Sequence, residues 1–91
     1  MAGLRVNEGI SIAPLTCDWR AIAGERLAAH TRPERVERGT AIILVDSAPW
    51  MMEARRALPV LLAGVRRRLG EQVVQRVRLL PDSGIQDRSA G

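Results

Sequence analysis

The chain has 91 residues, enough for one small domain with one modest core. Its hydrophobic fraction of 46% is typical of a folded chain, so wholesale disorder is excluded. Trp19 and Trp50 are the only aromatic residues, so we expect an aliphatic core. The formal net charge is +4 and all 14 basic residues are arginine. A small basic domain attracts polyanions such as nucleic acid or acidic protein surfaces.

The residue types also exclude several functions. Cys17 and His30 are the only residues of their types, which excludes an internal disulfide framework or a Cys/His zinc site. No phosphate loop of the GxxxxGK type is present, so the chain is not an ATP motor by itself. We therefore predict no catalytic residues, no metal and no cofactor. The sequence has no secretory signal pattern and no membrane-spanning run, which predicts a cytoplasmic protein, with nucleoid association as an alternative.

Residues 1–14 have no clear period and are expected to form a loose lead-in to a domain over residues 15–80. Apolar residues then recur at helical spacing from Leu15 to His30, which predicts one helix with Thr16 as its N-cap. Gly24 lies inside this segment, where glycine costs up to about 1 kcal/mol relative to alanine. We therefore expect Gly24 to allow the close approach of a neighbouring strand.

The next segment predicts a β-hairpin. Pro33 fits only an edge strand or the start of a strand, so residues 31–37 are expected to form a short, polar edge strand. Gly39 supplies the turn, and the β-branched segment "TAIILVDS" predicts a second, buried strand. The free edge beside Arg32 and Arg35 is open to two interpretations. Either a partner or a nucleic-acid backbone docks there, or Pro33 and the charges only prevent aggregation.

A second helix is predicted to begin after Ser47, an N-cap candidate, with an apolar stripe that continues to residue 69. Pro59 predicts a kink or a break in it, and Gly70 predicts its end. Trp50 is expected to be half-buried and to anchor the start of the helix against the sheet. Residues 72–80 predict a last strand, and residues 81–91 a polar, mobile tail. The order α-β-β-α-β predicts a single α+β domain, a three-stranded sheet with helices on one face.

Arginine placement is the most informative functional signal. On a helical wheel the arginines at 55, 56, 66 and 67 lie away from the apolar stripe, which predicts one basic surface on the second helix. Arg76 and Arg78 alternate onto one face of the last strand, and Arg32 lies beside the edge strand. Such groups neutralise phosphates without reading base sequence. Alternatively, these arginines only face solvent, and the aliphatic stems of their side chains cover apolar surface. The candidate nucleic-acid-binding residues are Arg32, Arg55, Arg56, Arg66, Arg67, Arg76 and Arg78.

Several short motifs occur in order between residues 18 and 80: a tryptophan, a small–Gly pair, "A.HT.P", a segment of the form "G.L.V.V.S..W", and a leucine-rich helix ending in glycine. In this combination the chain resembles the DciA-like family of bacterial proteins. The resemblance implies a KH-like fold similar to the N-terminal domain of the initiator DnaA. It also implies a role in loading or recruiting the replicative DnaB-type helicase, with affinity for DNA. The residues that carry the resemblance include Trp19, Gly24, His30, Pro33, Gly39, Trp50 and Gly70.

Three functional hypotheses remain open at this point. The first is a non-enzymatic replication accessory protein that has the DnaB-type helicase as its partner and binds single- or double-stranded DNA weakly. The second is a protein-binding adaptor without affinity for nucleic acid, basic only by composition. The third is a KH-like RNA-binding module. A KH domain clamps nucleotides with a GxxG loop, and the sequence contains no such string, which disfavours the third hypothesis.

Overall fold

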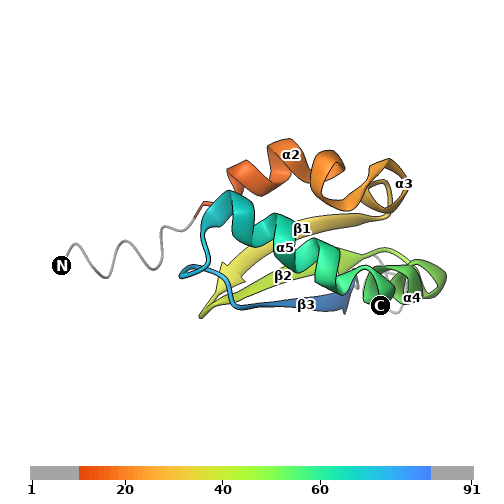
Figure 1. The fold of residues 1–91 in the computed structure, drawn as a ribbon. Coiled ribbons are helices and arrows are strands. Elements are labelled where there is room, and N and C mark those ends of the chain that lie inside the picture. Colours follow the sequence, from red (N-terminus) through yellow and green to blue (C-terminus); the bar gives the residue numbers. More distant parts are fainter. Residues whose placement is uncertain (1–10, 83–91) are drawn as a thin grey trace.

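The computed structural model describes residues 11–82, which form four helices and three strands. The helices cover one face of the sheet (Figure 1), which confirms the predicted α+β class. The prediction for residues 1–10 and for the tail from residue 83 falls outside the described range. Within that range no helix is long and apolar enough to cross a membrane. In chain order the elements are α2 (Ala13–Ala23), α3 (Glu25–Ala28), β1 (Thr31–Glu37), β2 (Thr40–Val45), α4 (Ala48–Arg56), α5 (Leu58–Leu69) and β3 (Arg76–Pro81).

The sheet has the strand order β1-β2-β3 and mixed directions. Strands β1 and β2 form the predicted hairpin, and the two residues of its turn, Arg38 and Gly39, both have positive φ, at 49° and 80°. Positive φ at both turn positions is what a tight type I′ hairpin requires. Strand β3 pairs in parallel with β2, and a parallel pair needs a crossover connection, which α4 and α5 provide. Pro33 lies on the edge strand β1, as predicted.

The first predicted helix is in fact two. Helix α2 begins two residues before Leu15, with Ile12 rather than Thr16 at the N-cap, because Pro14 fits the first turn. It ends at Gly24, which has φ 90° and ψ 149°, a conformation that residues with a Cβ rarely adopt. The short helix α3 follows at once.

The predicted reason for Gly24 is therefore wrong. The residue is exposed, and a Cβ added there would meet nothing within 4 Å. Its role is the backbone angle, which turns the chain between two helices. The close approach occurs instead at Gly64 in α5, where an added Cβ would lie 2.7 Å from Cγ2 of Ile22 in α2.

The second predicted helix divides at Ala57 into α4 and α5, so the break that Pro59 predicts is confirmed. Pro59 lies in the first turn of α5, where its missing N–H removes no helical hydrogen bond. Ser47 occupies the N-cap of α4, but its side chain makes no capping hydrogen bond. Gly70 ends α5 with φ 107°.

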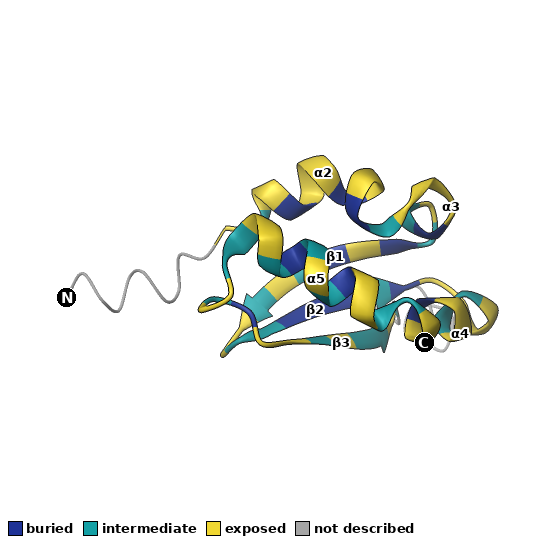
Figure 2. Ribbon diagram, viewed as in Figure 1, coloured by how far each residue is buried: buried dark blue, intermediate teal, exposed yellow. Residues whose placement is uncertain are grey.

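The core is aliphatic and lies between the helices and one face of the sheet. Figure 2 shows the buried segments along β2 and on the sides of α2 and α5 that face it. Trp19 is the one aromatic side chain buried among the described residues, with 5% of its surface exposed. Its indole N–H donates to the hydroxyl of Thr31 (2.9 Å), which donates to the backbone carbonyl of Leu27 (2.8 Å). This buried chain of two hydrogen bonds ties α2, α3 and β1 together.

We predict that Gly24→Ala and Gly24→Leu destabilise the domain by similar amounts, about 1–3 kcal/mol each, because the cost lies in the backbone angle. A close contact would make leucine much the worse of the two. Urea denaturation of both variants distinguishes these causes. A loss that grows with side-chain size would contradict the backbone explanation.

We also predict that Thr31→Val destabilises the domain by about 1–3 kcal/mol, since it leaves the indole N–H of Trp19 buried without an acceptor. Trp19→Phe removes that donor, so the Thr31→Val cost should be smaller in a Trp19→Phe background. A double-mutant cycle of unfolding free energies measures this coupling. Strictly additive losses would show that the hydrogen bond contributes nothing.

Candidate nucleic-acid interface

The face of the sheet opposite the core carries no helix among the described residues (Figure 1). Side chains alternate between the two faces of a strand, so the core residues Ala41, Ile43 and Val45 of β2 leave Ile42 and Leu44 on the opposite side. Pairing extends this face across all three strands. We call it the open sheet face, and its rows in register are Arg32–Leu44–Leu80, Arg35–Ile42–Arg78 and Glu37–Thr40–Arg76.

Ile42 shows how this face is covered. Only 5% of its surface is exposed, although no helix covers it. Its partners in register are Arg35 and Arg78, one on each neighbouring strand. Arginine stems lie along apolar surface while their charged ends stay in water, so these two stems shield the isoleucine. The two arginines thus lie on this face on either side of Ile42.

Charge on the open sheet face is unevenly compensated. Arg35 pairs with Glu34 and Glu37 at 3.7 and 3.3 Å, and Arg32 lies 3.4 Å from Asp82. No residue between 11 and 82 forms an ion pair with Arg76, Arg78 or Arg38 in the hairpin turn. These three arginines line a hollow at the hairpin end of the face, together with Thr40, Ile42 and Glu37, whose carboxylate pairs with Arg35. The guanidinium donors of the three arginines are available to an anion.

A β-bulge aligns the arginines of β1. Arg32 and Arg35 are three residues apart, so strict alternation would place them on opposite faces. The register shifts between Pro33 and Arg35, and the extra residue returns Arg35 to the face of Arg32. The sequence puts Arg35 beside the edge strand but carries no signal that places it on this face, and it gives none for Arg38. A bulge has no signal in the sequence beyond Pro33 itself.

The helix arginines fall into two groups. Arg55 and Arg56 end α4, whereas Arg66 and Arg67 lie near the end of α5, where they line a hollow with Ala63 and Glu71. The break at Ala57 separates the pairs, so the helical-wheel argument that superposed them does not apply. Arg66 is partly buried, and its Nε has no partner among the described residues. Whether either pair binds nucleic acid stays a prediction.

Two motif residues contact each other at the other end of the domain. The imidazole of His30 stacks on the indole of Trp50, with ring centroids 4.2 Å apart and an interplanar angle of 10°. Nδ1 of His30 lies 3.0 Å from a carboxylate oxygen of Asp46, and the guanidinium of Arg26 lies 5.9 Å from the Trp50 ring centroid. Trp50 is half-buried, as predicted. It packs against the core cluster, which includes β2 residues, and its ring also stacks on His30, just after α3.

Comparison with known proteins now identifies the family. The model described as "Dna[CI] antecedent, DciA" matches residues 2–79. The chain belongs to the DciA family. It is also 29% identical over 80 residues to a UPF0232 protein of Mycolicibacterium smegmatis, an alignment that covers 88% of this chain and 39% of the relative. A UPF0232 protein of Mycobacterium tuberculosis is 28% identical over 76 residues, with 84% of this chain and 38% of that protein covered. The chain thus spans about two fifths of the length of these relatives.

Proposed function

We propose that this DciA-family chain is a non-enzymatic accessory protein of DNA replication that binds the replicative DnaB-type helicase and contacts DNA through its open sheet face. The observation that carries the proposal is the family match over residues 2–79, since this family is of the helicase-loader type. The arrangement of arginines on the open sheet face supports the DNA contact.

The geometry of this face suits phosphate groups. Arg76 and Arg78 are two residues apart on one strand, about 6.6 Å along it, and Arg35 lies two strands from Arg78, about 9.6 Å away. A guanidinium offers paired donors that match phosphate oxygens. Both described aromatic side chains, Trp19 and Trp50, belong to the helical side of the sheet, so this face offers no ring for base stacking. Phosphate contact without sequence preference is the binding mode that remains.

The two other hypotheses lead to different observations. An adaptor that is basic only by composition would not retain DNA even at low salt. An RNA-binding KH-like module would prefer RNA, because proteins distinguish RNA through its 2′-hydroxyl groups. The junction between α4 and α5 reads Arg56-Ala57-Leu58 and contains no glycine pair with which to clamp a nucleotide backbone. We therefore favour DNA, and an RNA oligonucleotide of the same sequence belongs in the test.

We predict that the full chain binds unrelated duplex oligonucleotides alike, with a slope of log affinity against log salt of about −3 to −4.5 if three to five phosphates are neutralised. Arg76→Glu/Arg78→Glu should weaken binding to all sequences and flatten the slope by about 2. Fluorescence anisotropy over a salt series measures both, and circular dichroism checks the fold.

The matched control is Arg66→Glu/Arg67→Glu, which makes the same change in net charge on α5. We expect the control to retain most of the slope. Equal weakening by the two double variants would show that only net charge matters, and a larger effect of the control would move the contact to α5. Absence of binding by the wild-type chain at low salt would remove the DNA contact and favour the adaptor.

The helicase contact is tested separately. Cys17 is exposed on α2 and is the only cysteine of the chain, so a maleimide fluorophore attaches at one known place. We predict that the anisotropy of the labelled chain rises saturably when the DnaB-type helicase of the same genome is added, with nuclease present to exclude bridging by DNA. If the anisotropy does not rise at micromolar helicase, a direct contact with the helicase is contradicted. The DNA contact is unaffected by that result, because the salt series tests it separately.

A further inference from the structure

Strand β3 presents a regular, unoccupied edge. It is the last strand of the sheet, and no residue in the described range pairs with its outer side. The other edge strand, β1, is interrupted by Pro33 and by the register shift beside it. Residues 76–80 of β3 contain no proline, and their register with β2 is continuous. The outward N–H and C=O groups of such an edge are a template for a further strand.

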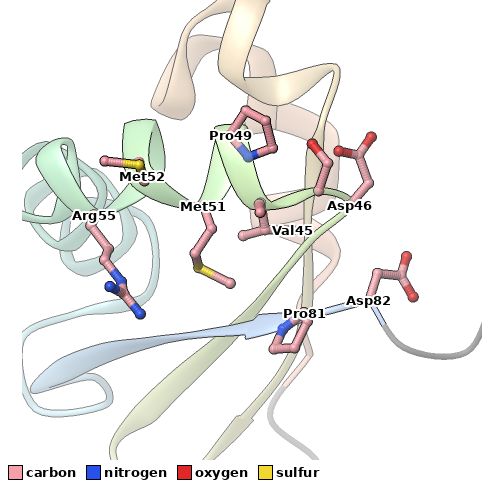
Figure 3. A pocket seen from close by; sticks show the side chains of 10 residues that line it. Val45, Asp46, Pro49, Met51, Met52, Arg55, Pro81 and Asp82 are labelled. Atoms are coloured by element: carbon pink, nitrogen blue, oxygen red, sulfur yellow. The ribbon is translucent and has the colours of Figure 1, made fainter. Parts of the chain in front are cut away.

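An apolar hollow of about 680 Å³ lies beside the end of this strand, beneath α4. Figure 3 shows the Met51 side chain pointing toward Val45 and Pro81, which are register partners at the ends of β2 and β3. Val45 belongs to the core, so the hollow lies on the helical side of the sheet. Met52 also lines the hollow and is 60% exposed. A fourth strand added beside β3 would place its inward side chains in this space.

Arg55 is the one basic residue that lines the hollow. The two carboxylates of the hollow each have a neighbour: Nδ1 of His30 lies 3.0 Å from Asp46, and Arg32 lies 3.4 Å from Asp82. Arg55 lines the hollow and forms no ion pair with any residue in the range 11–82. Met51 and Arg55 are four residues apart on α4, about 6 Å, and Arg55 points toward β3 in Figure 3. Side chains two residues apart on a strand are separated by about 6.6 Å, so one strand reaches both.

We propose that the outer edge of β3 and the hollow beneath α4 bind an extended segment of a partner protein, which joins the sheet as a fourth strand. On the side that faces α4, this segment carries an apolar side chain for the methionine-lined hollow and, two residues away, a carboxylate for Arg55. Main-chain hydrogen bonds give affinity in this mode and the side-chain pocket gives specificity. Methionine side chains adapt to different apolar groups.

A second copy of the chain suits this edge less well. Antiparallel pairing of residues 76–80 with the same residues of another copy brings Arg78 against Arg78, and like charges directly opposite each other are destabilising. The acidic partner segment avoids this repulsion. The site does not depend on the DNA contact, because the hollow and Arg55 lie on the helical side of the sheet.

The test uses the full chain and two acetylated, fluorescein-labelled hexapeptides, Thr-Glu-Thr-Leu-Thr-Thr and Thr-Leu-Thr-Glu-Thr-Thr, one for each strand direction. We expect at least one to bind and to slow hydrogen exchange of alternate amides in residues 76–80. Methylation of the peptide's edge-facing amide nitrogens should abolish binding. Arg55→Glu should weaken it at least tenfold, since a charged hydrogen bond is lost, and a peptide with lysine in place of glutamate should bind this variant again. Arg56→Glu, next in sequence but outside the hollow, is the control and should bind like the wild type.

Three results would overturn the proposal. The first is that neither peptide binds at millimolar concentration. The second is that binding survives methylation of the amide nitrogens, which would exclude strand addition. The third is that the outward amides of β3 are already protected in the free chain, which would mean that its own residues or a second copy cover the edge.

Discussion

The structure depends on a sheet that is covered by helices on one face only. Because side chains alternate along each strand, every core residue of β2 is matched by a neighbour that faces the other way. Ile43 lies in the core with no exposed surface, and Ile42 next to it needs cover from elsewhere. The stems of Arg35 and Arg78, its register partners on either side, supply that cover and leave their guanidinium groups in water. The need to shield apolar surface thus also builds the basic surface proposed to contact DNA.

On the helical side, specific contacts are needed to hold short helices against a small aliphatic core. Helix α3 has only 4 residues, too few for a helix to persist by itself. It is fixed because the Thr31 hydroxyl accepts from Trp19 and donates to Leu27. Directly before Thr31, the stack of His30 on Trp50 connects the α3 segment to α4. Both tryptophans therefore serve to join elements, and the aliphatic residues fill the space between them.

Much of this fold could be predicted from local chemistry. Pro33, Gly39, Pro59 and Gly70 each restrict or permit particular backbone angles, so the edge strand, the hairpin turn, the helix break and the helix end were predictable. Gly24 and Gly64 could not be told apart, because a glycine that turns the chain and one that admits a neighbour look the same in sequence. The bulge after Pro33 was also hidden, and with it the alignment of the arginines on the open sheet face. The helical wheel failed across Ala57 because a wheel assumes one continuous axis.

Amide chemical-shift mapping is the sharpest test of the proposed contact between DNA and the open sheet face. The ¹⁵N-labelled full chain is titrated with a short oligonucleotide at low salt. We predict that the largest shifts fall on the strands and the hairpin turn, around Arg35, Arg38, Ile42 and Arg78, and that they decline as salt is added. Shifts confined to α2 and α5, with the strands unchanged, would contradict it.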